Sequence, residues 1–391
     1  MPQIPTVDRL RPFASTIFAE MTELAVRHGA VNLGQGFPDT DGPAGMLEVA
    51  QQSIAGGLNQ YPPGRGMPVL RQAIAADRAR RYGTEYHPDT EVLVTVGATE
   101  AIAATILGLV EPGDEVVLIE PYYDSYAAAI ALAGAQRRTA RLVPDGDGFA
   151  LDLDSLRAAI TPKTRLLLVN SPHNPTGTVL SHADLTAIAD IAIARDLYVM
   201  ADEAYEHLYF DGHRHISLST LPGMRERTVV ISSAAKTFSV TGWKIGWACA
   251  PAPLLDAVLA AKQWLTFVGG GPFQPAIAHA LEHEQQWVAD LREGLSGKRL
   301  QLSAALSDAG FEVKRSDGTY FVCADIRPLG ATDGLAFCRE LPSRFGVAAV
   351  PVSAFADDRA SWNHLVRFAF CKKDAVLDEG VRRLRSVHTA P

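Results

Sequence analysis

The chain has 391 residues, of which 47% are hydrophobic and 20% are charged, and its 36 basic and 44 acidic residues give a formal net charge of −8. This acidic balance argues against nucleic acid as a partner, because binding to phosphates requires clustered Lys and Arg. The longest apolar runs are shorter than the roughly 20 residues that span a bilayer. Residues 1–13 contain no apolar signal-peptide core. We therefore expect a cytoplasmic protein with no membrane partner.

Short apolar strands and helical stretches rich in Ala and Leu alternate along the chain. A helix is predicted over residues 15–28. Strands that are apolar on both faces are predicted over residues 91–96, 114–120, 165–170, 197–202 and 228–233. Such strands are typical of a parallel sheet with helices on both faces. Between the third and fourth strands, Ser181 and Asp184 form a capping-box pattern at the start of a crossover helix. The fold class is therefore α/β with a mainly parallel sheet.

The pattern changes near residue 285, where an amphipathic helix over residues 286–306 is followed by short strands. These strands are FEVKR (311–315), TYFVCAD (319–325) and HLVRFAF (364–370). The change predicts a small α+β domain over residues 286–391 beside a large α/β domain over residues 45–285. Residues 1–44 are too few for a domain, so we expect them to pack with the small domain.

Polar residues follow the carboxyl ends of three predicted strands, where α/β sheets bind ligands. They are Asn170 and Asn174 after the third strand, Asp202 and Tyr205 after the fourth, and Ser233 and Lys236 after the fifth. Each residue alone is more often a turn or surface residue. Together they predict a site that combines amides, a carboxylate, a phenol and an amine.

A phosphate site is predicted at the turn in VTVGATEAI (94–102), where a strand enters a helix. Free N–H groups and the helix dipole favour an anion there, and Lys244 offers a second cation. Tyr122 or Tyr123 adds an aromatic ring to these groups. A phosphate cradle, an amine, a carboxylate and an aromatic ring are the groups that a pyridoxal phosphate site requires.

Eight motifs occur in order between residues 8 and 385. They are NLGQGFPD (32–39), NQYPPGRG (59–66), EPYYDSY (120–126), NSPHNPTG (170–177), DEAYEHLYF (202–210), SSAAKTFSVTGWKIGW (232–247), GTYF (318–321) and VRFAF (366–370). With these motifs the chain resembles the class I aminotransferases of pyridoxal phosphate fold type I. It is most similar to the kynurenine and glutamine aminotransferase branch, and within it to the actinobacterial N-succinyldiaminopimelate aminotransferases. The resemblance implies a homodimer that moves an amino group between an L-amino acid and a 2-oxo acid by a ping-pong mechanism.

The resemblance also implies which residues bind the cofactor. Lys236 would carry it covalently, Asp202 would contact the pyridine nitrogen, and Tyr205 and Asn174 would bind its phenolic oxygen. Tyr123 would stack on the ring. The phosphate would be held by Ala98, Thr99, Ser233, Lys244 and, from the neighbouring subunit, Tyr61.

For the substrate, the resemblance implies that Arg367 binds the α-carboxylate in a two-pronged geometry that Lys does not reproduce. Asn174 and the backbone of Gly36 would complete this carboxylate site. Phe18 stands where relatives carry a tryptophan against the substrate side chain, and FVGGGPF (267–273) replaces a bulkier, polar loop. The side-chain preference is therefore left open.

Three other interpretations of the sequence were weighed. A glutamine, kynurenine or methionine aminotransferase with cysteine-conjugate β-lyase activity would use the same residues and differ only in the leaving group. A ligand-sensing regulator of this fold would need a basic DNA-reading element, and no such element is evident. The HALEH sequence at 279–283 matches a zinc-peptidase pattern, but it fits an exposed helix face equally well. No metal site is predicted.

Overall fold

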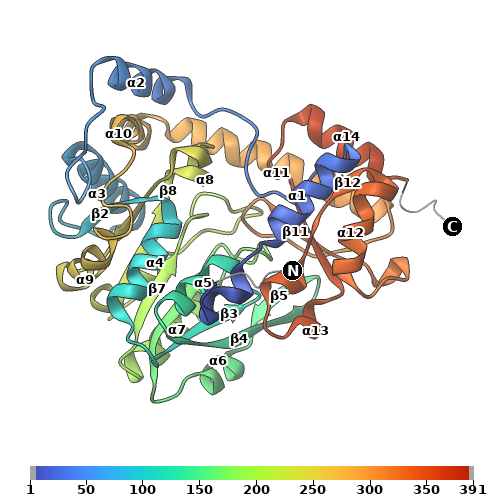
Figure 1. Ribbon diagram of the computed structural model, residues 1–391, viewed down its shortest axis with the longest axis horizontal. Helices are drawn as coiled ribbons and strands as arrows, with labels where there is room; N and C mark the ends of the chain where they lie inside the picture. The colour runs from blue at the N-terminus through green and yellow to red at the C-terminus, as the bar shows by residue number, and fades with distance from the viewer. Residues whose placement is uncertain (1–5, 387–391) are drawn as a thin grey trace.

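The computed structural model describes residues 6–386. Residues 1–5 of the segments predicted at 1–13 and 1–44, and residues 387–391 of the segment predicted at 286–391, lie outside the described residues. The described chain forms two main sheets, each with its own helices (Figure 1). Within this range no helix combines the length and the apolar character that a membrane span needs. The four cysteines are buried and free.

The large sheet has eight strands in the order β2–β9–β8–β7–β6–β3–β4–β5. In that order their bounds are Val92–Val96, Ile245–Cys249, Thr228–Ser233, Tyr198–Asp202, Thr164–Asn170, Glu115–Glu120, Gln136–Asp145 and Gly148–Leu151. The strands β4, β3, β6, β7 and β8 are parallel to their neighbours in this run, whereas β9 and β5 are antiparallel. The predicted mainly parallel sheet is therefore confirmed, and the three strands missing from the prediction are β4, β5 and β9.

Helices cover both faces of the large sheet. One face is covered by α4 (Gly97–Leu109), α5 (Asp124–Leu132) and α9 (Ala252–Lys262). The other face is covered by α2 (Ala44–Ala55), α3 (Pro68–Tyr82), α6 (Leu153–Ala159), α7 (His182–Ala194) and α10 (Gln274–His283). Within β6, Leu166 and Leu168 pack under the first set, and Leu167 and Val169 pack under the second. This explains why the strand is apolar throughout.

The crossover helix α7 begins as the sequence predicts. The Ser181 side chain accepts a hydrogen bond from the backbone N–H of Asp184, and the Asp184 side chain accepts one from the backbone N–H of Ser181. These two bonds satisfy donors that the start of a helix otherwise leaves free. The capping box therefore sets where the connection between β6 and β7 becomes helical.

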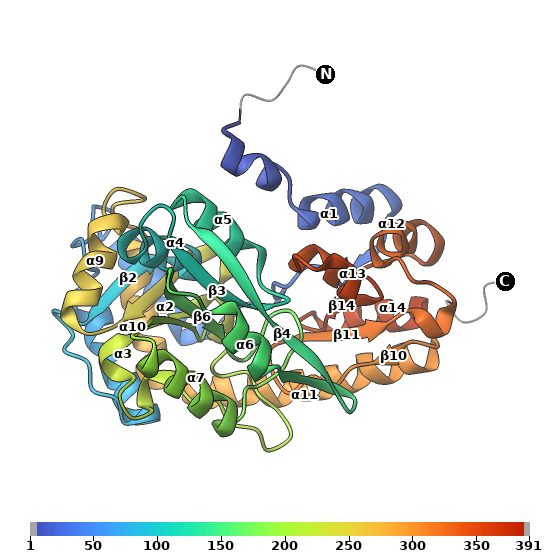
Figure 2. The same ribbon diagram turned by 90° about the horizontal axis from the view of Figure 1, so that it is seen from below.

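The small sheet has four antiparallel strands in the order β10–β11–β14–β13. Their bounds are Glu312–Val313, Phe321–Asp325, Leu365–Ala369 and Val350–Pro351. Its helices are α11 (Gln285–Asp308), α12 (Gly334–Phe345), α13 (Arg359–Trp362) and α14 (Asp374–Leu384). In Figure 2 the large sheet lies to the left and the small sheet to the right, and α11 runs between the two parts.

Residues 17–33 of the N-terminal segment belong to the same folded unit as the small sheet. Helix α1 (Ile17–His28) contacts α12, and β1 (Val31–Asn32) pairs in parallel with β12 (Val347–Ala348). Met21 of α1 and Leu33 share a core with the small-sheet strands. The small unit is therefore built from residues near both ends of the described range, whereas η1 (Asp8–Phe13) contacts α5 of the large-sheet unit.

A short segment after β13 joins the small sheet to the large one. It contains η7 (Val352–Phe355), and the backbone N–H of Tyr122 donates to the Phe355 carbonyl at 2.7 Å. The Tyr122 hydroxyl donates to Asp357 at 2.8 Å, and Arg137 donates to both oxygens of Asp357. These bonds hold the η7 segment against the ends of the large-sheet strands.

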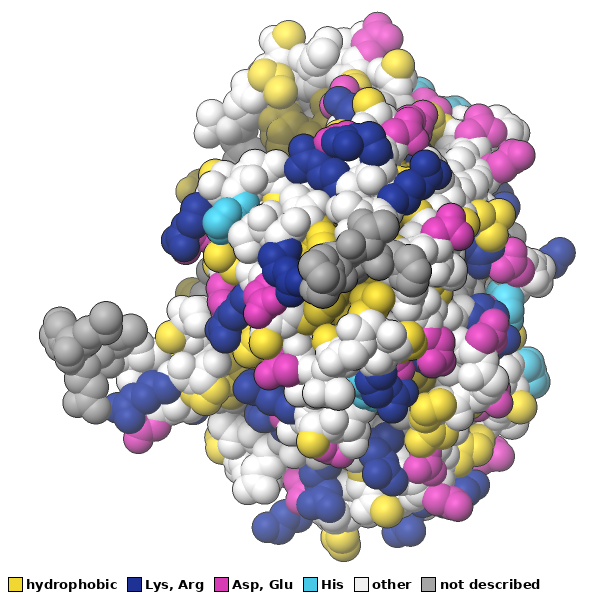
Figure 3. Space-filling view, turned by 90° about the vertical axis from the view of Figure 1, so that its right-hand side faces the viewer, with side chains coloured by type: hydrophobic (Ala, Val, Ile, Leu, Met, Phe, Trp, Pro, Cys, Tyr) yellow, Lys and Arg dark blue, Asp and Glu magenta, His cyan; other side chains and the backbone are white. Residues whose placement is uncertain are grey.

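Charged side chains of both signs are intermixed on the face that Figure 3 shows, which includes the helices over the small sheet. Lys and Arg side chains gather in the upper middle of this view, and Asp and Glu side chains lie beside them.

Candidate active site

A cavity of about 370 Å³ lies at the carboxyl ends of the central large-sheet strands, and residues of both sheets line it. All the predicted site residues except Tyr61 contribute to its walls. They are Phe18, Gly36, Ala98, Thr99, Tyr123, Asn174, Asp202, Tyr205, Ser233, Lys236, Lys244 and Arg367. Residues that are up to about 350 positions apart in the sequence therefore meet in one enclosed space.

Lys236 lies in α8 (Ala234–Thr237), directly after the end of β8. Its Nζ lies 3.5 Å from the Gly36 carbonyl oxygen and 5.9 and 5.7 Å from the ring centres of Tyr205 and Tyr320. Burial lowers the pKa of the Lys236 amine to about 8, because the charged form loses its hydration. About one tenth of the amine is therefore unprotonated, and so nucleophilic, at pH 7, far more than for an amine with the ordinary pKa of 10.5.

Asp202 lies at the last position of β7, and neighbouring groups fix its carboxylate. The Tyr126 hydroxyl donates to Oδ2 at 2.6 Å, and the Ala204 backbone N–H donates to Oδ1 at 3.0 Å. Asn170 donates to the Asp202 carbonyl at 2.9 Å. Burial raises the pKa of Asp202, and the Tyr126 hydrogen bond opposes this rise because it stabilises the anion. The site thus holds a carboxylate oriented by two donors.

The start of α4 and the Lys244 side chain form a cradle for an anion. Gly97 begins the helix with a φ of +72°, and a Cβ at this position would lie 3.2 Å from Lys244 Nζ. A Cβ on Gly246 would lie 2.5 Å from the Gly97 carbonyl carbon. The two glycines therefore let the lysine amine approach the helix start, where backbone N–H groups and the dipole favour a phosphate. Ser233, at the start of α8, also lines this part of the cavity.

Arg367 on β14 is 1% exposed and reaches across to the large sheet. Its Nη1 donates to Asn174 Oδ1 at 2.9 Å, and its Nη2 donates to the Gly34 carbonyl at 3.1 Å. The guanidinium carbon lies 3.9 Å from the centre of the Phe321 ring. Among the described residues nothing accepts a hydrogen bond from its Nε. A buried guanidinium with donors to spare is suited to bind a carboxylate.

Aromatic side chains form the remaining wall near Arg367. The Phe18 ring lies 5.4 Å from the Arg367 guanidinium and 5.7 Å from the Phe355 ring. A Cβ on Gly36 would lie 2.4 Å from the Phe321 ring, so the chain can pass here only as glycine. The substrate side chain would therefore meet a largely apolar surface.

Tyr61 is the predicted site residue that the single chain does not bring into the cavity. Its side chain is 82% exposed and packs edge-on against Phe267, with ring centres 5.6 Å apart. Trp264 and Leu265, which precede Phe267 in the chain, are also exposed. An exposed group of large apolar residues is typical of a protein interface.

Tyr126 lines the cavity but was missed by the site prediction, although it lies in the EPYYDSY motif one helical turn after Tyr123. Asn170, which the prediction named among the strand-end residues, also lines the cavity. The structure also distinguishes the two adjacent tyrosines, since Tyr122 bonds to Asp357 and Tyr123 lines the cavity.

Comparison with known proteins identifies the family. The family model of class I and II aminotransferases matches residues 29–384. The chain belongs to the class I and II aminotransferases. Members of this family are generally dependent on pyridoxal phosphate.

Three relatives of this aminotransferase cover almost its whole length. A probable N-succinyldiaminopimelate aminotransferase of Mycobacterium tuberculosis is 62% identical, with 99% of both chains covered. The structure of the M. tuberculosis N-succinyldiaminopimelate aminotransferase superposes with a TM-score of 0.96 at 63% identity, covering 98% of this chain and 100% of that one. The methionine aminotransferase of Escherichia coli is 40% identical, with 99% of both chains covered. The human kynurenine–oxoglutarate transaminase 3 is 34% identical, covering 95% of this chain and 87% of its own. The protein is thus an aminotransferase of fold type I.

Proposed function

We propose that this aminotransferase uses pyridoxal phosphate to transfer the amino group of N-succinyldiaminopimelate to or from a 2-oxo acid, within diaminopimelate and lysine biosynthesis. The observation that carries the proposal is the convergence of a low-pKa lysine amine, a buried carboxylate and a buried guanidinium on one cavity. The 62% identity to the M. tuberculosis protein supports the choice of substrate.

The residues present fit pyridoxal phosphate. The glycine-lined start of α4 and Lys244 match a phosphate, and the oriented carboxylate of Asp202 matches a protonated pyridine nitrogen. Tyr205, Asn174 and Tyr123 line the same cavity, so the first two would bind the phenolic oxygen and the third would offer a ring face. We propose these residues, with Ala98, Thr99 and Ser233, as the cofactor site.

When bound, pyridoxal phosphate supplies an electron sink that stabilises negative charge at the substrate Cα. Lys236 Nζ would hold the cofactor covalently and, once released by the incoming amine, would take up the Cα proton, for which a pKa of about 8 is suitable. Arg367 and Asn174 would bind the α-carboxylate and so orient the Cα–H bond toward Lys236. Arg367 and Asn174 are buried, which limits the access of water to the bound carboxylate.

We also infer that the active unit is a homodimer. Tyr61 is exposed in the single chain, as a residue that completes a neighbouring subunit's phosphate site would be. A two-fold arrangement would bury it with Phe267 and Trp264 in both copies at once. Light scattering should show a dimer, and Tyr61→Ala should weaken cofactor binding. A fully active monomer would contradict this inference.

A second candidate is a methionine-type aminotransferase that also eliminates sulfur leaving groups. The three cations among the described residues of the cavity wall are Lys236, Lys244 and Arg367, and the proposed mechanism uses all of them. Arg65 is engaged with Asp256 and does not line the cavity, so the described residues of one chain place no further cation on the cavity wall for a distal substrate carboxylate. The apolar wall formed by Phe18 favours an apolar side chain instead.

A panel of amino donors separates the two candidates. N-succinyldiaminopimelate, methionine, kynurenine and glutamine should be compared with 2-oxoglutarate and pyruvate as acceptors, and the parallel double-reciprocal lines of a ping-pong mechanism should be seen. A kcat/KM at least tenfold higher for N-succinyldiaminopimelate supports the first candidate, since that corresponds to about 1.4 kcal/mol of discrimination. A preference for methionine together with pyruvate release from a cysteine conjugate supports the second. No transfer from any donor contradicts both.

A further inference from the structure

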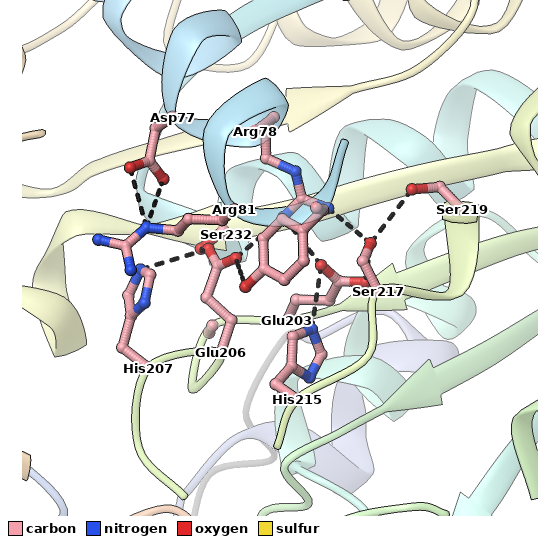
Figure 4. Close-up of polar contacts among 12 residues, drawn as sticks. Asp77, Arg78, Arg81, Glu203, Glu206, His207, His215, Ser217, Ser219 and Ser232 are labelled. Carbon is pink, nitrogen blue, oxygen red and sulfur yellow. Dashed lines mark hydrogen bonds and ion pairs between the residues drawn. The ribbon is translucent and has the colours of Figure 1, made fainter. Parts of the chain in front are cut away.

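A buried polar network lies beside the cavity residues of β7 and β8, and it is formed by residues of helix α3, of the segment that follows β7 and of β8 itself (Figure 4). We call it the Arg78 network, and its members are Arg78, Tyr82, Glu203, Glu206, Ser217 and Ser232. None of them lines the active-site cavity. The network is therefore separate from the groups that the proposed mechanism uses.

Arg78 is the centre of this network and is 1% exposed. Its Nη1 donates to Glu203 at 3.0 Å and to Glu206 at 2.9 Å, and its Nη2 donates to Ser217 at 2.5 Å. The guanidinium carbon also lies 4.2 Å from the centre of the Tyr82 ring. One guanidinium thus holds two carboxylates and a hydroxyl, and its planar shape fixes the angles between these bonds.

Further donors satisfy the two carboxylates. Glu206 accepts hydrogen bonds from Tyr82 at 2.7 Å and from Ser232, and Glu203 accepts one from Ser217 at 2.7 Å. Burial tends to raise the pKa of Glu206, but the charge of Arg78 and further neighbours, including the Ser232 hydrogen bond, together outweigh it and lower the pKa to about 2. Both carboxylates are therefore held as anions with defined orientations.

The geometry around Glu203 and Glu206 also resembles a metal site. These two residues and His215 offer ligand atoms within 4.8 Å of one another. The Arg78 guanidinium, however, already donates to both carboxylates. The charge that a metal ion would supply is thus provided by the protein itself.

Three network residues are direct sequence neighbours of cavity residues. Glu203 follows Asp202, Glu206 follows Tyr205, and Ser232 precedes Ser233. Asp202, Tyr205 and Ser233 line the cavity, whereas Glu203, Glu206 and Ser232 belong to the Arg78 network. Because adjacent residues of a strand point to opposite faces, Ser232 and Ser233 must separate in this way.

We propose that Arg78 is a positioning residue that holds Asp202, Tyr205 and Ser233 in the geometry that binds pyridoxal phosphate. Arg78 acts on Asp202 and Tyr205 through its bonds to Glu203 and Glu206. It acts on Ser233 through Glu206, which accepts a hydrogen bond from Ser232. The inference rests on the proposed function, because it concerns the cofactor site assigned there.

The energetics of buried ion pairs support this role. Replacing a buried ionic group by well-packed apolar residues is often neutral for stability or better, so such a group is weak evidence for stabilisation alone. The Arg78 network instead joins α3 to two strand ends with directional bonds. Its distinctive contribution is therefore the orientation of the backbone that carries the cavity residues.

Two conservative variants test the role. Arg78→Lys keeps the cation and loses the planar fork, and Glu206→Gln keeps the shape and loses one anion. The matched control is Arg299→Lys, because Arg299 is also buried and pairs with Asp211 at 2.6 Å, and it does not line the cavity. Each protein is measured by thermal unfolding, by equilibrium dialysis against pyridoxal phosphate, and by its absorbance as a function of pH.

We expect Arg78→Lys and Glu206→Gln each to raise the dissociation constant for pyridoxal phosphate at least tenfold and to shift the midpoint of the absorbance titration. The KM for the amino donor should change less than twofold, because Arg367 lies on the other sheet. Arg299→Lys should lower the melting temperature without either effect. If Arg78→Lys does not fold, Glu206→Gln and the charge-balanced triple variant Arg78→Met, Glu203→Gln, Glu206→Gln provide the same readouts.

The inference is overturned if the Arg78 and Glu206 variants bind pyridoxal phosphate with the parent's affinity and titration midpoint while their melting temperatures fall. It is equally overturned if Arg299→Lys weakens cofactor binding as much as Arg78→Lys does. A parent protein that binds no pyridoxal phosphate refutes the proposed function, and this inference with it, so the two failures are distinguishable.

Discussion

Tyr126 on α5 donates a 2.6 Å hydrogen bond to Asp202 at the end of β7. The two residues are 76 positions apart in the sequence, and both are buried. The bond stabilises the Asp202 anion against the burial that raises its pKa. Tyr126 therefore helps to keep a negative charge available for the pyridine nitrogen of the proposed cofactor.

Removing the Tyr126 hydroxyl should weaken this support. In Tyr126→Phe the pKa of Asp202 should rise further, so the acid limb of the kcat/KM profile should move to higher pH. A hydrogen bond to a charged group is worth about 2 kcal/mol, so a roughly 30-fold loss in kcat/KM is expected. The control is Tyr122→Phe, which removes a hydroxyl bonded to Asp357 instead. An unchanged pH profile for Tyr126→Phe would contradict the role.

Asp202→Asn should slow proton removal from the substrate without preventing substrate binding. Asparagine keeps the size of the side chain but cannot balance a positive pyridine nitrogen. Loss of one partner from a buried charge pair costs about 3 kcal/mol or more, so kcat should fall at least ~100-fold. The KM for the amino donor should stay within about threefold, and the cofactor absorbance should change. Steady-state and single-turnover kinetics would show whether the loss lies in kcat.

Arg367→Lys should have the opposite pattern. The charge remains, but the two parallel donors are lost, so kcat/KM for amino acids should fall by about 2–3 kcal/mol. The absorbance of the resting protein should not change, because Arg367 lies on β14 and contacts Asn174 and Gly34. A changed resting spectrum with an intact kcat/KM would show that Arg367 does not bind the α-carboxylate.

The Lys236 amine should make the stability of the cofactor-free protein depend on pH. Its folded-state pKa of about 8 lies below its ordinary value of 10.5, so between these values the unfolded chain binds a proton that the folded chain does not. Stability therefore rises with pH across this window. Lys236→Met should stabilise the cofactor-free protein below pH 8 by about 3 kcal/mol, and this gain should shrink toward pH 10.5.

Urea unfolding at pH 7 and pH 10 measures this difference. The exposed Lys163→Met serves as the control, since it alters the chain's charge equally without changing a buried amine. A stabilisation by Lys236→Met that is the same at both pH values would show that burial does not set the protonation of this amine.

The strands that sequence analysis located best are those buried on both faces. Strands β3 and β6, for example, are apolar along their length because helices cover both sides, and this leaves a clear pattern. Strand β4 was missed because its exposed positions make it rich in charge, as in QRRTARLVPD. Strand β9 was missed because it contains Gly246 and runs antiparallel within a mainly parallel sheet.

The cavity residues could be proposed from motifs, but their supports could not. Lys236 and Asp202 follow strand ends, which is a local signal. The Tyr126 bond to Asp202, the Gly34 carbonyl that accepts from Arg367, and the Arg78 network all join segments that are distant in the chain. Such contacts depend on how helices pack against the sheet, and no single motif encodes that packing.

The hydrogen bond between Arg367 and Asn174 joins a residue of the small sheet to a residue that follows β6 of the large sheet. A substrate carboxylate bound by both residues would become a noncovalent cross-link between the two sheets. The amino acid or 2-oxo acid would then hold the two sheets together as well as react. The supply of substrate would thereby set the mechanical stiffness of the enzyme, which hydrogen exchange along β14 and residues 170–177 would record as slower amide opening.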